Sequence, residues 1–140
     1  MDTRTAKKRS EIMRAVRTAN TGPEMEVRSI LHRLGFRFRT HNRELPGRPD
    51  VVLRRHRKVV FVHGCFWHGH RCSKGKLPKS RLNYWAPKIA TNKKRDTQNL
   101  AAIRRLGWQS IVVWQCELRN RRKLVKRLNA YMQRRQYVRK

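Results

Sequence analysis

Apolar residues along this 140-residue chain follow a helical period in some segments and form short continuous runs in others. Apolar side chains spaced three and four apart between residues 27 and 34 predict a helix. Thr21 or Gly22 would cap its start, with Pro23 in the first turn. Gly35 would end it.

The same helical spacing recurs twice in the second half of the chain. Residues 93–106 are predicted to form a helix closed by Gly107, and another is expected from residue 118 onward. The basic segment from residue 4 to 19 could form a helix that buries little. The positions that would face the core of the two later helices are Leu100, Ile103, Leu106, Leu124, Val125, Leu128 and Met132.

Short apolar runs predict three buried strands, at residues 50–53, 58–63 and 108–114. The first two are close enough to form a hairpin through residues 54–57. Before them, Phe36 and Phe38 alternate with arginines as a short strand would. The order of helix, strands, helix, strand and helix predicts one domain with an α/β sandwich fold.

The charge of the chain points to a polyanionic partner. The 37 Lys and Arg residues outnumber the 8 Asp and Glu residues, which gives a formal net charge of +29. Phosphates of nucleic acid attract such a surface without any sequence code. An anionic membrane is the rival partner, but no segment approaches the roughly 18 apolar residues of a spanning helix. No signal-peptide pattern opens the chain, so an intracellular, cytoplasmic protein is expected.

Histidines and cysteines are concentrated directly after the second predicted strand. Residues 63–72 hold three histidines and two cysteines, and Cys116 follows the third strand. Three thiols and one imidazole make a full tetrahedral set for structural zinc, and the candidate ligands are Cys65, His70, Cys72 and Cys116. His68 could replace His70. The alternative is that Cys116 is a buried core thiol and the histidines are solvated.

A second candidate site lies at the ends of the predicted hairpin. Asp50 begins the first strand and His63 ends the second, so pairing would bring them together. A carboxylate there suits Mg²⁺, a hard cation that prefers oxygen ligands. His63 and His68 could transfer protons or contact a phosphate, because imidazole titrates near neutral pH. The alternative for Asp50 is a turn or capping residue after Pro49.

Four motifs together resemble the very short patch repair (Vsr) DNA mismatch endonucleases. They are residues 46–50 (PGRPD), 61–68 (FVHGCFWH), 70–72 (HRC) and 114–116 (WQC). The resemblance extends from about Lys8 to Arg119. It implies a restriction-endonuclease-like fold, with a central mixed sheet flanked by helices. It also implies Mg²⁺-dependent nicking on the 5′ side of the thymine in a thymine–guanine mismatch, which arises when 5-methylcytosine deaminates.

The resemblance also implies roles for individual residues. Asp50 would be the Mg²⁺-binding carboxylate, with the backbone carbonyl of Val62 as another ligand, where the family commonly has threonine. His63 stands where the wider superfamily places lysine. His68 would activate water, with Glu24 on the first helix orienting it.

The zinc set and a DNA wedge are implied in the same way. Cys65, His70, Cys72 and Cys116 match the family's structural zinc ligands. Phe66 and Trp67 would enter the base stack beside the mismatch, and Met13 would join from the other groove. The alternative for Phe66 and Trp67 is ordinary core packing, and for Met13 packing on a helix face.

The chain is predicted to consist of a basic DNA-contacting segment (1–20), an endonuclease core (21–119) and a basic C-terminal helix or tail (120–140). Double-stranded DNA is the expected partner, other mismatch repair proteins are possible ones, and a monomer is expected. Two alternatives stay open. One is a restriction-type endonuclease of the same fold that cuts paired DNA. The other is a zinc-stabilised DNA-binding protein without catalysis.

Overall fold

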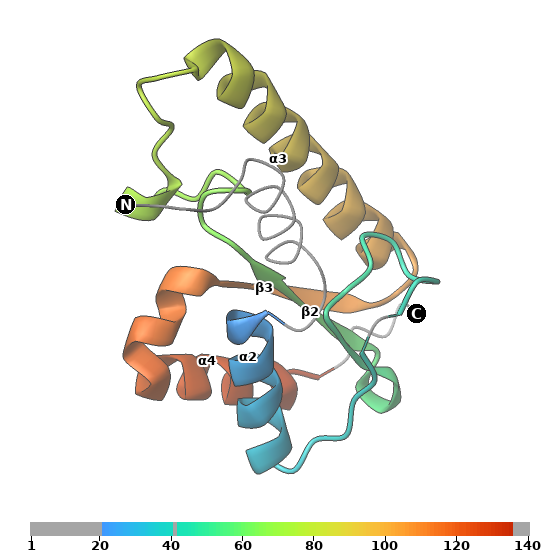
Figure 1. Cartoon of the computed structure of the whole chain (residues 1–140). Coiled ribbons are helices and arrows are strands. Elements are labelled where there is room, and N and C mark those ends of the chain that lie inside the picture. The colour runs from blue at the N-terminus through green and yellow to red at the C-terminus, as the bar shows by residue number, and fades with distance from the viewer. Residues whose placement is uncertain (1–20, 41, 136–140) are drawn as a thin grey trace.

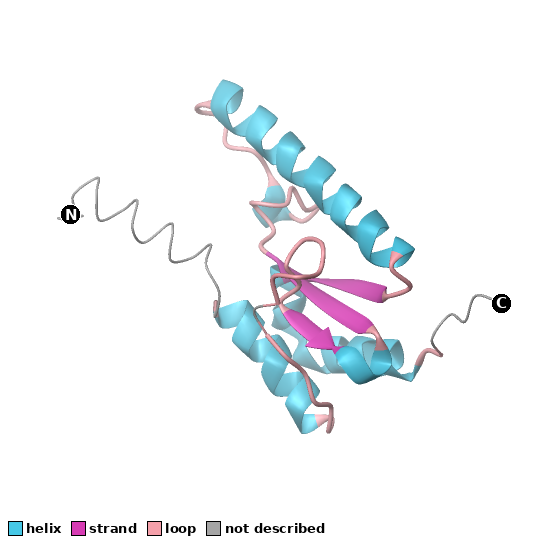
Figure 2. Cartoon of the chain, turned by 90° about the vertical axis from the view of Figure 1, so that its right-hand side faces the viewer, coloured by secondary structure: helices cyan, strands magenta, loops and turns pink. Residues whose placement is uncertain are grey.

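A three-stranded mixed sheet forms the centre of the computed structural model, which describes residues 21–40 and 42–135. Helices cover both faces of the sheet, with α2 and α4 on one side and α3 on the other (Figure 1; Figure 2). This arrangement confirms the predicted α/β sandwich with a mixed sheet.

The strands are β1 (Val51–Leu53), β2 (Lys58–His63) and β3 (Gln109–Trp114), in the order β1-β2-β3. The α-helices are α2 (Gly22–Arg33), α3 (Leu82–Arg105) and α4 (Arg121–Gln133), and the 3₁₀ helices are η1 (Arg54–His56), η2 (Ser73–Gly75) and η3 (Gln115–Asn120).

Helix α2 begins and ends at the predicted signals. Thr21 is the N-cap, and its side-chain oxygen accepts a hydrogen bond from the backbone N–H of Glu24 at 3.4 Å. Pro23 occupies the first turn, where a missing N–H costs nothing. Gly35 follows the helix at a φ of +89°, a left-handed conformation that glycine adopts without a steric penalty.

Strands β1 and β2 form the predicted hairpin and bring Asp50 close to the end of β2. They pair antiparallel, with Val51 opposite Val60 and Leu53 opposite Lys58. Strand β3 runs parallel to β2 from Lys58 opposite Gln109 to His63 opposite Trp114. Because the carboxyl ends of β2 and β3 meet at one edge, the residues that follow both strands lie near each other.

Helix α3 is eleven residues longer at its N-terminal end than the predicted segment 93–106. Pro87 lies inside the helix, where a proline removes one backbone hydrogen bond and costs roughly 3 kcal/mol. Packing offsets this cost, because Ile89 is buried and Trp85 contacts the rings of Phe66 and Trp67. Tertiary contacts therefore extend the helix where local propensity does not.

Helix α4 is part of the main core. Leu124, Leu128, Tyr131 and Met132 are buried in one cluster with side chains of α2 and the sheet. The Tyr131 hydroxyl donates to the carbonyl of Val59 at 2.9 Å. These contacts confirm the predicted helix and place it against the strands that carry the site.

Two predicted elements have other outcomes. The alternating segment around Phe36 and Phe38 forms no named strand, and only Arg39 makes an isolated antiparallel bridge, to Val52. Residues 1–20, which include Met13 and the basic segment 4–19 that could form a helix, lie outside the described residues. None of the helices in the described part has the length and apolar content that a membrane crossing requires.

Candidate active site

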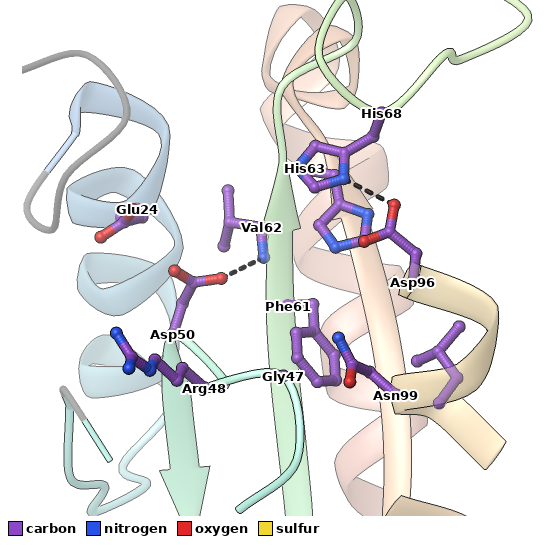
Figure 3. Close-up of a pocket in the computed structure, with 11 residues that line it drawn as sticks. Glu24, Gly47, Arg48, Asp50, Phe61, Val62, His63, His68, Asp96 and Asn99 are labelled. Atoms are coloured by element: carbon purple, nitrogen blue, oxygen red, sulfur yellow. Dashed lines mark hydrogen bonds and ion pairs between the residues drawn. The ribbon is translucent and has the colours of Figure 1, made fainter. Parts of the chain in front are cut away.

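A cavity of about 190 Å³ opens at the carboxyl end of β2, between the start of α2 and the middle of α3. Figure 3 shows two groups of side chains on opposite sides of the β2 ribbon: Glu24 and Asp50 on one, and His63, His68 and Asp96 on the other. The residues that line the cavity are Glu24, Gly47, Arg48, Asp50, Phe61, Val62, His63, His68, Asp96, Asn99 and Leu100.

The first group is a pair of carboxylates. Asp50 Oδ2 accepts a hydrogen bond from the backbone N–H of Val62 at 2.6 Å, which joins the start of β1 to the end of β2. Burial, reinforced by the neighbouring charge of Glu24, raises the pKa of Asp50 to about 7. Glu24 itself is buried and accepts from Arg28 Nη2 at 3.3 Å. A buried acid in contact with a half-buried one is stabilised either by sharing a proton or by binding a cation.

The second group is a histidine pair with an aspartate. The rings of His63 and His68 stack with centroids 3.8 Å apart and planes 4° from parallel. His68 Nδ1 donates to Asp96 Oδ2 at 2.6 Å. Burial, and secondarily the electrostatic influence of the neighbouring His68, lowers the pKa of His63 to about 3, so the His63 imidazole is neutral near pH 7. The aspartate fixes the tautomer of His68 and leaves Nε2 as the possible proton acceptor.

This arrangement corrects one predicted contact. We expected Glu24 to orient His68, but the carboxylate hydrogen-bonded to His68 is that of Asp96, whereas Glu24 lies with Asp50 and Arg28. The sequence pattern did not point to Asp96. Its position in the sequence could have indicated it, since it is the only acidic residue between Asp50 and Glu117 in a strongly basic chain.

The cysteine–histidine cluster, defined as Cys65, His70, Cys72 and Cys116, assembles beside this site. Its four donor atoms all lie within 4.8 Å of one another, and Cys116 Sγ is 3.5 Å from His70 Nδ1. The structure thus brings His70 to the thiols and His68 to the pocket. All three cysteines are free thiols. Three sulfurs and one nitrogen at this spacing fit a tetrahedral zinc ion.

The loop between β2 and α3 holds the cluster through close backbone packing. The N–H of His70 donates to the carbonyl of Cys65 at 2.9 Å, which closes the first turn after the strand. Gly69 has a φ of +62°, and a Cβ there would lie 2.8 Å from Ile89 Cγ2 on α3. Gly75 lies so close to the carbonyl of His70 that no larger residue fits. Glycine at both positions lets the loop fold tightly around the ligands.

Aromatic side chains next to the pocket form a cluster of three rings. Phe66 packs edge-to-face on Trp67 at 5.2 Å and on Trp85 at 5.1 Å, and the two tryptophans are 5.5 Å apart. Lys88 Nζ lies 5.8 Å from the Trp67 ring and 5.7 Å from the Trp85 ring. All three rings are only half-buried. Trp85, to which the sequence assigned no role, thus joins the two predicted wedge residues.

These groups define a class of protein. A carboxylate pair suited to a hard cation and a histidine–aspartate pair suited to proton transfer line the same cavity. Half-buried aromatic rings lie beside them, on a chain with a net charge of +29. Together they describe a phosphodiester hydrolase that acts on nucleic acid.

Comparison with known proteins identifies the family. The family model of the DNA mismatch endonuclease Vsr matches residues 1–74. Type II nicking enzyme V.XorIIP of Xanthomonas oryzae pv. oryzae is 57% identical over 111 residues, which cover 79% of this chain and 82% of that protein. Type II nicking enzyme V.NmeAIP of Neisseria meningitidis is 44% identical over 125 residues, 89% of each chain. DNA mismatch endonuclease Vsr of Escherichia coli K12 is 44% identical over 116 residues, 83% of this chain and 74% of that one. The chain belongs to the Vsr DNA mismatch endonuclease family and is an endonuclease, as the motifs predicted.

Proposed function

We propose that this endonuclease nicks duplex DNA on the 5′ side of the thymine in a thymine–guanine mismatch, in a Mg²⁺-dependent reaction. The observation that carries the proposal is the pocket at the end of β2, where the Glu24–Asp50 pair and the His68–Asp96 pair flank one cavity. The names of its relatives, a mismatch endonuclease and nicking enzymes, support the same conclusion. A restriction-endonuclease-like fold is part of the proposal, supported by the mixed sheet between helices.

The carboxylate pair fits a Mg²⁺ site by its donor chemistry. Burial keeps Asp50 partly protonated at neutral pH, because its charged form has lost water. A cation bound beside the charged carboxylate would offset that loss, so cation binding would be strongly favoured. Asp50 would hold the ion, together with the backbone carbonyl of Val62. A bound Mg²⁺ supplies charge neutralisation at the phosphodiester and its leaving oxygen. The family commonly has threonine at this position. Since the proposed ligand is a backbone carbonyl, the valine found here provides the same ligand.

Proton transfer is assigned to His68. With Nδ1–H donated to Asp96, a neutral His68 accepts a proton only at Nε2, which would take it from the attacking water. His63 remains neutral and stacked on His68, so it contributes a neutral hydrogen-bonding group beside the phosphate and prevents His68 from rotating. Asp96 acts as the positioning carboxylate that keeps the correct tautomer in place.

The cysteine–histidine cluster is assigned to structural zinc. Burial raises the pKa of the Cys65 thiol to about 12, whereas hydrogen bonding from His70 lowers that of Cys72 to about 6. A buried thiol of this kind becomes a thiolate only beside a cation, which zinc would supply. The ion would then join the loop after β2 to the start of η3.

Mismatch recognition is assigned to the aromatic cluster. Trp67 directly precedes His68, so insertion of its ring into the base stack would bring the adjacent phosphate to the pocket. A mismatched step costs less to unstack than a paired one, which gives selectivity of a few kcal/mol. Phe66 and Trp85 would support the wedge, and Met13 is proposed to enter from the other groove.

The test is nicking of a 5′-labelled duplex that contains one thymine–guanine mismatch, compared with its fully paired counterpart. A nick beside the thymine that needs Mg²⁺, is absent from the paired duplex and is lost in Asp50→Ala would support the proposal. Cutting of both duplexes would replace it with the restriction-type endonuclease. If the protein binds the duplex but cuts it in none of the flanking sequences tested, a non-catalytic DNA-binding protein would be favoured.

A further inference from the structure

A continuous set of rings connects the cysteine–histidine cluster to the catalytic histidines. Trp114 stacks on His70 with centroids 4.1 Å apart and planes 21° from parallel. The same indole meets His63 edge-to-face at 5.3 Å, and His63 in turn stacks on His68. One side chain therefore contacts both a zinc ligand and a member of the histidine pair.

The sheet and the start of η3 fix the position of this indole. Trp114 and His63 are register partners at the last positions of the parallel strands β3 and β2, so their side chains lie on the same face of the sheet. The backbone N–H of Trp114 donates to Glu117 Oε1 at 3.0 Å. Arg127 of α4 holds that carboxylate with two hydrogen bonds, of 2.7 and 2.8 Å. The backbone from which the indole extends is thus held in place, and the stacked neighbours restrain the ring itself.

We propose that Trp114 is a positioning residue through which the cysteine–histidine cluster fixes the orientation of His63 and His68. The inference rests on the proposed function, since it assigns the histidines to the nicking reaction. A flat ring between two imidazoles blocks the rotation of each about its Cβ–Cγ bond. A metal ion bound to His70 would hold that imidazole still, and the indole of Trp114 is stacked on it. The edge contact between this indole and His63 would in turn hold the His63 ring. A displacement of the reacting groups by about 1 Å can cost roughly 100-fold in rate.

Variants of Trp114 separate this role from general packing. Trp114→Leu removes the ring, Trp114→Phe keeps a smaller one, and Trp108→Leu is the matched control. Trp108 directly precedes the first residue of the same strand, at the end opposite Trp114, and packs against the core cluster of Val52, Val59, Phe61 and Ile103. We expect Trp114→Leu to nick roughly 10- to 100-fold more slowly in a single turnover, with duplex affinity within about two-fold of the unchanged chain. Trp114→Phe should recover most of the rate, and Trp108→Leu should lower only the melting temperature.

A second variant tests the link from the metal side. His70→Cys replaces the ligand nitrogen by a thiolate, so four sulfurs can still hold one zinc ion, but the stacked imidazole is gone. We expect zinc at one ion per chain together with a loss of nicking rate similar to that of Trp114→Leu. Release of zinc to a chelating dye should also become roughly ten-fold faster in Trp114→Leu and stay unchanged in Trp108→Leu.

Histidine NMR gives a readout that does not depend on cleavage. In protein labelled at the imidazole rings, His70→Cys and Trp114→Leu should both shift the signals of His63, and Trp108→Leu should not. Unchanged His63 signals in His70→Cys, or a wild-type nicking rate in Trp114→Leu, would overturn the inference. Failure of the unmodified chain to nick any mismatch would count against the proposed function alone, because the zinc-release and NMR results would still decide the role of Trp114.

Discussion

Replacing Asp50 by asparagine should stabilise the fold in the absence of Mg²⁺ while abolishing nicking. The pKa of Asp50 is about 7 in the folded chain and 3.8 in a model peptide. A raised pKa for an acid means that ionisation opposes folding, so the penalty grows as the pH rises from about 4 to 7 and is constant above that. Asparagine keeps an oxygen that can accept the hydrogen bond from Val62 and carries no charge.

The size of the effect follows from the pKa difference. The difference between a pKa of 3.8 and one of about 7 corresponds to roughly 4 kcal/mol, and sharing of the proton with Glu24 reduces the part assignable to Asp50. We therefore expect Asp50→Asn to gain about 2 to 4 kcal/mol at pH 8. For a domain of this size each kcal/mol raises the melting temperature by roughly 3 °C, so the gain is on the order of 10 °C.

Thermal unfolding of zinc-loaded protein in Mg²⁺-free buffer without chelator would measure this gain at several pH values. The difference between variant and unmodified chain should shrink as the pH falls from 8 to 5, since other titrating groups cancel in the comparison. Added Mg²⁺ should raise the melting temperature of the unmodified chain and leave that of Asp50→Asn unchanged. Glu44→Gln, at a carboxylate whose side chain is 84% exposed, is the control and should change little. Equal melting temperatures at pH 8, or a difference independent of pH, would refute the reasoning.

Three further predictions address other parts of the structure. Asp96→Asn should slow nicking roughly 100-fold with duplex affinity unchanged in a filter-binding assay, and an equal loss of binding would argue against a role in orienting His68. Trp67→Ala should reduce the ratio of mismatch to paired-duplex binding more than it reduces binding to paired DNA, whereas equal losses would indicate a core residue. Leu128→Ala should cost about 3 to 5 kcal/mol in denaturant unfolding, because it empties a fully buried position between α4 and the sheet, and a cost under about 1 kcal/mol would contradict that packing.

Local sequence signals predicted the elements whose ends depend on nearby residues. The N-cap at Thr21 and the left-handed glycine at 35 act within one turn of helix α2, so its bounds could be read directly. The hairpin likewise placed Asp50 beside the end of β2, because antiparallel pairing leaves little choice of register. The start of α3 depends instead on aromatic rings that pack against it from the loop after β2. The low helix propensity of Pro87 disfavours a helix there, so the sequence did not predict it.

The site could likewise be predicted only where its residues are close in sequence or on neighbouring strands. The cysteines and histidines after β2 lie within a short loop, and the parallel strand β3 delivers Cys116 to the same edge. The partner of His68 was not predictable from spacing, because Asp96 comes from the middle of a helix and its position depends on how α3 docks on the sheet. The same holds for Trp85, whose place in the aromatic cluster follows from that docking.

The position of helix α4 in the chain has a consequence for protein synthesis. Every residue proposed here for chemistry or metal binding precedes position 117, yet α4 supplies buried side chains to the main core. Lys58, buried at the start of β2, donates to the carbonyls of Met132 and Arg134 at the end of that helix. A nascent chain that has not yet added α4 therefore carries all the catalytic groups but lacks the support that orders β2 beneath them. A chain that ends before residue 121 is therefore expected to carry the site residues without DNA-cleaving activity.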